Sequence, residues 1–370
     1  ETVHYNLLQR TGPENVMLVS GFAEGLIREV NKHHPDNIDY LNLNPKLIEL
    51  EKEYFNSIDF ENVGLIYEDP RLYLRKHEKK YDALIFSLPE PMSARMNRYY
   101  TQGFFELAKS RLAQDGVLSF SLPGNTNFLN EADKKLLASV VATCETVFEH
   151  VLVIPGEQIY LLASPVSLDL DIFKGFENRD IENDYVNPAY IDPGLMAMRQ
   201  DMILESLGHV GPRINKDLKP LGYYLSFQRW VKKAGSKWYF IPLVLLFVLV
   251  IVAFVLSKKH NKALFVSGFS AASVQFSLLL LFQVYYGFVY QMLGVLIMLF
   301  MMGLALGIFV LPRLIEKQHN AISFLFLAFG AYVAIMPFLL RWLFQVQAAP
   351  WLFFLVFFLM AADCGTLSGG

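Results

Sequence analysis

One uncharged apolar run, Trp238 to Ser257, constrains this chain more than any other feature. It reads WYFIPLVLLFVLVIVAFVLS, and a helix of about 20 apolar residues covers the roughly 30 Å of hydrocarbon in a bilayer. Further apolar runs follow, at Ala263–Val284, Gln291–Leu311, Ala321–Leu340 and from Trp351 to the end of the chain at 370. We therefore expect residues 238–370 to form a multi-pass transmembrane α-helical bundle, with the last helix cut short.

The lipid membrane is accordingly the first expected partner. Lysine and arginine residues in the loops that flank the apolar runs normally indicate which side faces the cytoplasm. Here they balance: one side carries Lys258, Lys259, Lys262, Arg313 and Lys317, and the other carries Arg229, Lys232, Lys233, Lys237 and Arg341. The sequence therefore predicts an integral membrane protein without assigning the side of the region before Trp238.

The residues before Trp238 have a different character, with charged helical patterns between short β-rich runs. Over the whole chain 54% of residues are hydrophobic, and the formal net charge is −3. A balance so close to neutral gives no indication of a nucleic-acid partner. The two cysteines, Cys144 and Cys364, lie far apart in the sequence, so we expect neither a disulfide framework nor a cysteine metal site.

Seven β-rich runs alternate with helical segments in this first part of the chain. The runs are Val16–Val19, Ile38–Leu43, Val63–Tyr67, Ala83–Ser87, Val117–Ser121, Val151–Ile154 and Ile159–Ala163, and the helical segments are Glu24–Lys32, Pro45–Phe55, Thr101–Leu112 and Glu131–Phe148. Such alternation predicts an α/β fold with a parallel sheet. A tight turn at Pro155-Gly156 favours an antiparallel final pair, which is usual in a methyltransferase-like (Rossmann-type) seven-stranded sheet.

Ligands of such sheets bind beyond the carboxyl ends of the strands. The first strand is followed by Ser20-Gly21-Phe22-Ala23-Glu24-Gly25, a turn into a helix whose N-terminus suits a polar or anionic group. Glu68-Asp69-Pro70 follows the third strand, and Ser87-Leu88-Pro89-Glu90-Pro91 follows the fourth. We expect the carboxylates of Asp69 and Glu90 to face one crevice.

Several stretches of this part of the chain resemble one enzyme family. They are VMLVSGFAEGLIREV, YDALIFSLPEP, YYTQGFFELAKSRLAQDGVLSFSLPG and VIPGEQIYLLAS. Residues 1–165 resemble the spermidine synthase (polyamine aminopropyltransferase) family. The apolar segment that begins FVSGFSAASVQFSLLLL is similar to the multi-pass membrane type of this family.

The resemblance implies a site for decarboxylated S-adenosylmethionine, or a related nucleoside, as substrate; no cofactor is certain. By resemblance the nucleoside-binding positions are Gly21, Glu24 and Gly25 in the glycine-rich loop, Asn42 at the acid of the second strand, and Asp69 beside the adenine. The acidic gate falls at Ser87, the position of the family's base, and at Glu90, which is a candidate catalytic carboxylate. No metal site is implied.

Two of these positions depart from the family pattern. Asn42 replaces a carboxylate, so it would bind ribose hydroxyls more weakly. Ser87 replaces the aspartate that helps to remove a proton from the attacking amine, and a serine hydroxyl without an adjacent base does not accept a proton near neutral pH. Arg95, Asn97, Arg98, Tyr99 and Tyr100 follow the gate as the entry to a helix. Either they contact an anionic or aromatic ligand, or the helix start is solvated and the tyrosines pack on the sheet.

Residues 166–237 read as a connector or cap that leads to the membrane, because they are too long for a simple linker. The first hypothesis for function is a membrane-anchored protein with a degenerate aminopropyltransferase site that binds a nucleoside-type or polyamine-like (small cationic) ligand. The second is an active aminopropyltransferase of altered chemistry, with Glu90 as base. The third is a structural or transport component, in which the first domain docks a membrane-protein partner or second copy, or acts as a sensor.

Overall fold

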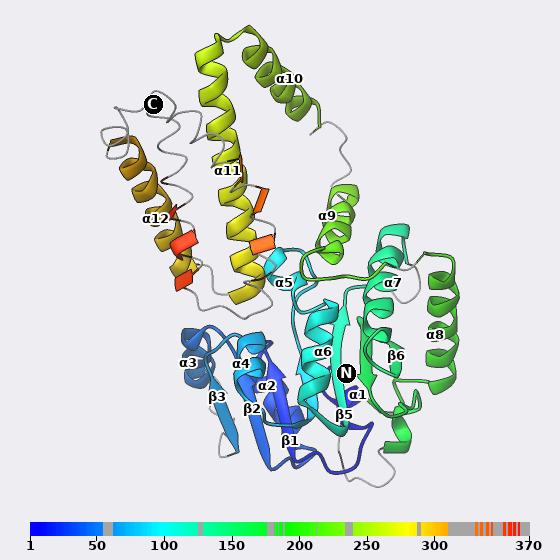
Figure 1. The fold of residues 1–370 in the computed structure, drawn as a ribbon. Helices are drawn as coiled ribbons and strands as arrows, with labels where there is room; N and C mark the ends of the chain where they lie inside the picture. Colours follow the sequence, from blue (N-terminus) through cyan, green and yellow to red (C-terminus); the bar gives the residue numbers. More distant parts are fainter. Residues whose placement is uncertain are drawn as a thin grey trace. The chain divides into compact units, whose positions relative to one another are not determined.

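The computed structural model describes residues 1–54, 62–124, 129–175, most of 181–211, 213–233, 240–286, 290–309 and scattered positions from 330 to 362. The chain divides into two compact units, Glu1–Ala234 and Gly235–Gly370. The named strands all belong to the first unit, which also contains the positions singled out by the resemblance (Figure 1).

A seven-stranded sheet forms the centre of the first unit. Its strands are β1 (Asn15–Val19), β2 (Asn37–Leu41), β3 (Val63–Ile66), β4 (Tyr81–Phe86), β5 (Leu112–Leu122), β6 (His150–Pro155) and β7 (Ile159–Ser164). They lie in the order β3-β2-β1-β4-β5-β7-β6. Strand β7 runs antiparallel to both β5 and β6, and the other neighbours are parallel. The predicted mixed sheet with an antiparallel final pair is therefore confirmed.

Helices flank the sheet (Figure 1). They are α1 (His4–Leu7), α2 (Ala23–Asn31), α3 (Pro45–Tyr54), α4 (Pro70–Lys76), α5 (Ala94–Asn97), α6 (Gln102–Arg111), α7 (Glu131–Glu145), α8 (Pro193–Gly208) and α9 (Leu221–Lys233). The sequence patterns predicted α2, α3, α6 and α7. Helix α4 was missed, although Asp69-Pro70 is a strong helix start: the Asp69 carboxylate accepts the backbone N–H groups of Arg71 and Leu72, and Pro70 stands in the first turn.

Side chains of the central strands point alternately to two cores. On β1, Val16 and Leu18 belong to one buried cluster, which includes Ile27 of α2 and Ile48 of α3. Met17 on the same strand faces a second, larger cluster. Because successive strand residues point to opposite faces, a strand buried on both faces reads as a continuous apolar run. This explains why β4 could be predicted from the sequence YDALIF.

Helices α8 and α9 pack against the sheet domain. Ile203 and Leu207 of α8, and Leu221 and Leu225 of α9, are buried in the larger cluster together with residues of α6 and α7. The end of the segment expected to be a connector is thus built into the first unit. This packing places the polar side of α9 within reach of the loop that follows β4.

The second unit contains α10 (Phe240–Leu256), α11 (Lys259–Tyr286) and α12 (Tyr290–Phe309). They overlap the first three predicted apolar helices, whereas the predicted helices 321–340 and 351–370 fall mostly outside the described residues. Side chains from Val244 to Val252 on α10 are 40–64% exposed. Among the helices as far as the structure describes them, none combines the length and the apolar character required to cross a membrane.

Candidate ligand site at the ends of the parallel strands

The predicted site positions meet at one edge of the sheet, where four parallel strands end. The backbone N–H of Ser20, after β1, donates to the carbonyl oxygen of Leu41 at 2.9 Å. The N–H of Asn42 donates to Ile66, and that of Ser87 donates to Val19, each at 3.0 Å. These bonds continue the ladder past the strand ends. They bring the glycine loop, Asn42 and the gate loop together, as the sheet topology predicts.

Gly21 and Ser87 are in direct contact at this edge. Gly21 has a φ of +81°, and a Cβ at this position would lie 2.8 Å from the Ser87 Oγ and 2.9 Å from its Cβ. Only glycine fits here, for both conformational and steric reasons. By contrast, a Cβ on Gly25 would meet only Phe22 Cδ1, at 3.4 Å. The glycine loop therefore keeps one position that depends on glycine, and the Ser87 side chain packs against it.

The N-terminus of α2 already holds a carboxylate from the protein itself. Glu51, a buried residue on α3, accepts the backbone N–H of Ala23 at 2.9 Å. Burial raises the pKa of the Glu51 carboxyl. Glu24, also buried, is bonded to Arg28 one turn along α2, at 3.2 Å. The anion-binding role expected of this helix start is thus filled internally by Glu51.

Asn42 is also bonded within the protein. Its amide nitrogen donates to the Tyr40 hydroxyl at 3.1 Å, and its amide oxygen accepts the N–H of Asn44 at 3.0 Å. The Tyr40 hydroxyl in turn donates to the Gly21 carbonyl at 2.9 Å. Burial raises the pKa of Tyr40, which remains a donor. Tyr40 therefore ties the second strand to the glycine loop, and Asn42 donates to the hydroxyl that makes this tie.

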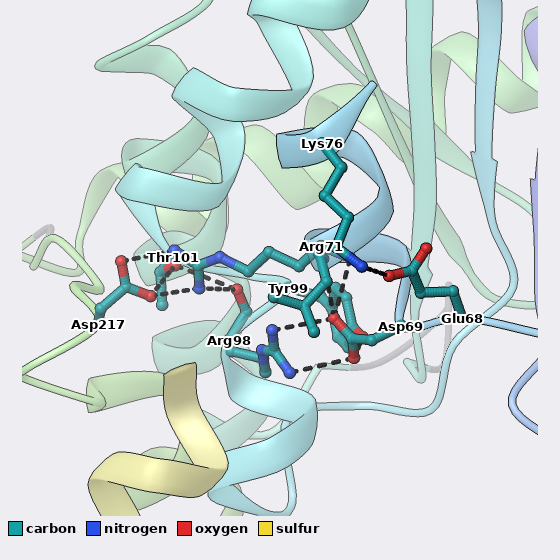
Figure 2. Close-up of polar contacts among 9 residues, drawn as sticks. Glu68, Asp69, Arg71, Lys76, Arg98, Tyr99, Thr101 and Asp217 are labelled. Carbon is teal, nitrogen blue, oxygen red and sulfur yellow. Dashed lines mark hydrogen bonds and ion pairs between the residues drawn. The ribbon is translucent and has the colours of Figure 1, made fainter. Parts of the chain in front are cut away.

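Asp69 lies at the centre of a buried network (Figure 2). Its side chain has no exposed surface, and neither has that of Arg98, which it binds through two contacts at 3.0 and 3.1 Å. The Tyr99 hydroxyl donates to the same carboxylate at 2.8 Å. With the two backbone N–H groups of α4, the carboxylate has a full set of donors. Asp69 does not present a carboxylate to a crevice in this structure, in contrast to the expectation from sequence.

A second ion pair extends this network to the segment between α8 and α9 (Figure 2). Arg71 binds both oxygens of Asp217, at 2.6 and 2.8 Å, and donates to the Arg98 carbonyl at 3.0 Å. Thr101 donates to Asp217 at 2.8 Å. Burial opposes ionisation of Asp217, but the Arg71 guanidinium lowers the pKa of its carboxyl. A Cβ on Gly103 would lie 2.6 Å from Asp217 Oδ2, so this approach requires glycine.

Glu90 stands at the rim of the same edge. Its side chain is 19% exposed and is paired with Arg229 of α9. The gate loop is fixed by Tyr100, whose hydroxyl donates to the Pro89 carbonyl at 3.0 Å. Glu90 is therefore the more accessible of the two acids that follow β3 and β4 in the family pattern. Its negative charge is already balanced by a cation that the sequence analysis did not identify.

The residues that follow the gate loop are largely buried. Arg98, Tyr99 and Tyr100 are buried, with at most 5% of any side chain exposed. Asn97 is buried as well and accepts the N–H of Tyr223 at 3.0 Å. The tyrosines are packed, as the second interpretation expected, but the helix start is not solvated as that interpretation also expected, because Asn97 and Arg98 are buried and Arg95 is half-buried. No local pattern in the sequence predicted Glu51, Asp217 or Arg229, because each comes from a distant segment.

Ser87 differs from the acids of this edge in one chemical respect. Among the described residues, no carboxylate or imidazole hydrogen-bonds its hydroxyl, which lies beside the Gly21 backbone. Without a neighbouring base, this hydroxyl does not take up a proton from an amine near neutral pH. The neighbouring carboxylates of Asp69 and Glu90 are paired with Arg98 and Arg229.

The chain was compared with known proteins. Residues 1–158 match the family model of the spermine/spermidine synthase domain. The polyamine aminopropyltransferase of Methanocaldococcus jannaschii is 32% identical over 120 residues, which cover 31% of this chain and 41% of that protein. That of Korarchaeum cryptofilum is 34% identical over 121 residues, covering 31% and 37%. The chain thus matches less than half the length of these curated relatives.

Two solved structures are also similar. A spermidine synthase in complex with the transition state analogue AdoDATO covers 56% of this chain and 73% of its own, with 20% identity and a TM-score of 0.46. The spermidine synthase from Thermotoga maritima covers 56% and 72%, with 18% identity and a TM-score of 0.44. By the matched family model and the relatives in sequence, the first part of this chain is similar to the spermine/spermidine synthase family.

Proposed function

We propose that this protein is a membrane-anchored member of the spermidine synthase family with a degenerate aminopropyltransferase site. The site binds a nucleoside-type or polyamine-like ligand and does not catalyse efficient aminopropyl transfer. Ser87 carries this proposal, because it stands where the family has its proton-accepting aspartate and packs against Gly21.

The chemistry of aminopropyl transfer explains why the residue at position 87 matters for activity. The neutral nitrogen of a diamine attacks the methylene carbon next to the sulfonium, the carbon–sulfur bond breaks, and the nitrogen loses a proton. A positioned carboxylate accelerates such a step by accepting the proton. A hydroxyl without a base does not, so a bound diamine would remain protonated and unreactive at neutral pH.

The internal bonds of the other site groups support the same proposal. Asn42 is bonded to Tyr40, Asp69 to Arg98 and Tyr99, and Glu51 fills the start of α2. Ligand binding would have to compete with each of these contacts. Among the carboxylates that the resemblance identified, Glu90 has the most exposed side chain, at 19%, compared with 11% for Glu24 and none for Asp69.

The membrane anchor is supported by the sequence after α9. The run Trp238–Ser257 has no charged residue, and the described part of α10 exposes aliphatic and aromatic side chains along its length. Exposed apolar side chains in such number are unfavourable in water and favourable in lipid. Resistance of the protein to extraction from membranes by carbonate at high pH would test the anchor, and full release by carbonate would refute it.

The function is tested by calorimetric titration of the full-length protein in detergent with 5′-methylthioadenosine, decarboxylated S-adenosylmethionine and putrescine. Product analysis after incubation of the two substrates together completes the test. We expect binding of at least one ligand and no aminopropyl product at ordinary enzyme rates. Turnover at rates typical of enzymes, about 1 per second or faster, would refute the degenerate site.

The partial exposure of Glu90 favours one alternative, an active transferase that uses Glu90 as base. In that case Glu90→Gln would abolish turnover and leave nucleoside binding intact, because the amide keeps the shape of the side chain and cannot accept the proton. The reverse change at the base position, Ser87→Asp, would raise turnover under the degenerate-site proposal. If Glu90→Gln retained any turnover seen in the natural protein, Glu90 would not be the base.

A further inference from the structure

Arg229 of α9 holds two acidic side chains that come from different parts of the first unit. Its side chain is 8% exposed, and its Nη1 is paired with Glu90 of the gate loop. Its Nε lies 2.5 Å from Oδ1 of Asp133, near the start of α7. The other Asp133 oxygen accepts the Asn130 amide at 2.6 Å. One guanidinium thus neutralises the only partly exposed acid of the gate and links it to α7.

Helix α9 is positioned for this contact by bonds near its first turn. The Gly222 N–H donates to Asn215 at 3.2 Å, and the Tyr223 N–H donates to Asn97 at 3.0 Å. A Cβ on Gly222 would lie 2.5 Å from the Asn97 Oδ1, so the close approach of α9 to α5 requires glycine at this position. Leu221 and Leu225 of the same helix are buried. Arg229 therefore reaches Glu90 from a docked helix rather than from a free loop.

A guanidinium and an alkylammonium compete for the same carboxylate lone pairs, because both are cationic donors without an acceptor. Glu90 is bonded to the first of these in the structure. We propose that α9 is an autoinhibitory lid whose Arg229 occupies, as a built-in cation, the position at Glu90 that an amine ligand requires. The inference rests on the proposed function, since it concerns the same site and a ligand of the same class.

The lid has two consequences. Binding of a diamine and docking of Arg229 on Glu90 exclude each other, so the apparent affinity is reduced by the fraction of molecules in which the lid is closed. Diamine binding in turn displaces Arg229 and loosens α9, whose last residue, Lys233, precedes the apolar helix α10 by a short stretch of chain.

The affinity is tested with the full-length protein in detergent, titrated with putrescine. The variants are Arg229→Gln and, as matched control, Lys232→Gln, which removes a positive charge from an exposed residue of the same helix. We expect Arg229→Gln to bind putrescine at least about 10-fold more tightly than the natural protein, and Lys232→Gln to bind it as the natural protein does. Equal affinities in all three proteins would overturn the lid.

A second variant covers the case in which Arg229→Gln fails to fold. Asp133→Asn weakens the hold on Arg229 without altering Glu90, and we expect a smaller gain in putrescine affinity in the same direction. Hydrogen exchange of α9 amides supplies an independent readout: putrescine should accelerate exchange in residues 221–233 of the natural protein and leave the β1 amides unchanged. Binding without faster exchange in α9 would overturn the inference.

The outcomes separate this inference from the proposed function. If putrescine binds the natural protein and Arg229→Gln equally, the lid is refuted and ligand binding stands. If neither the natural protein nor any folded lid variant binds putrescine, both the amine ligand and the lid are refuted. Suppose that Arg229→Gln binds putrescine more tightly than the natural protein. If the double variant Arg229→Gln/Glu90→Gln loses this gain, the result supports the lid and places the amine at Glu90.

Discussion

The acids after β3 and β4 lie at the same edge of the sheet and are both paired with arginine, yet their surroundings differ. Asp69 has no exposed surface and is bound by Arg98, 29 residues away in sequence, by Tyr99 and by the backbone of α4. Glu90 is 19% exposed and is bound by Arg229, 139 residues away. The first carboxylate is part of the local framework, whereas the second depends on a helix that packs from a distance.

Burial and the origin of the arginine partner therefore separate two acids that lie close to one another in the fold. A fully buried carboxylate with all of its lone pairs bonded stabilises the loop that contains it, and removing it leaves a buried positive charge. A carboxylate at the rim loses little stabilisation when its cationic partner leaves, because water can solvate the carboxylate in place of that partner.

The largest loss of folding stability is expected from Asp69→Ala. It removes the counter-charge of the buried Arg98 and the N-cap of α4, and breaking a buried ion pair costs about 3–5 kcal/mol. Urea unfolding of the full-length protein, followed by hydrogen exchange of β1 and β4 peptides, measures this loss. Glu149→Gln is the control, because Glu149 is paired with Lys109 at the surface. Equal stability of the two variants would show that the Asp69 network is dispensable.

A smaller loss is expected from Asp217→Asn. The amide keeps the shape of the side chain but weakens the bidentate contact with Arg71, and a hydrogen bond to a charged group is worth about 1.5–3 kcal/mol. Because Asp217 lies between α8 and α9, hydrogen exchange should accelerate in α9 more than in β4. Asp169→Asn, which affects an exposed pair with Lys174, serves as control. Uniform acceleration across the unit would argue against a specific tie to α9.

The sheet and its site edge could be predicted from sequence because they depend on local patterns. The apolar run of β4 and the Pro155-Gly156 turn indicate strands without information from the rest of the chain. The strand order then places the loop that contains Ser87 beside Gly21. Helix α4 was predictable as well, from the cap at Asp69 and the proline that follows. Asp69 was instead expected to contact a ligand, whereas its carboxylate caps the helix.

The partners of the site residues could not be predicted. Arg229, Asp217 and Glu51 lie on segments whose packing depends on the assembled core, and a charged residue on a helix is usually exposed. Nothing near Arg229 in the sequence distinguishes it from Lys232, which is exposed. The sequence therefore indicated which positions form the edge, but not that the protein's own side chains bind them.

The pH dependence of stability tests whether Asp217, like Asp69, belongs to the buried ion pairs that stabilise the fold. Burial acts to raise the pKa of the Asp217 carboxyl, but the Arg71 guanidinium outweighs it. The pKa in the folded protein therefore lies below the unfolded value of about 3.8. Its contribution is therefore fully present above about pH 4 and is lost as pH falls through the lower folded pKa. Urea midpoints measured from pH 5 down to pH 2 should fall less steeply in Asp217→Asn. Identical slopes would mean that Asp217 is not the titrating group.

The smallest loss of stability is expected from Glu90→Gln, under about 1 kcal/mol, because the pair with Arg229 is partly open to water. Arg229 keeps Asp133 as counter-charge in this variant, so no buried cation is left alone. The same urea unfolding measures the change, with Glu68→Gln as control for a partly exposed acid paired with Lys76. A loss as large as that of Asp69→Ala would make Glu90 a framework residue too, and the arginine at the gate would then be a structural tie and not a displaceable lid.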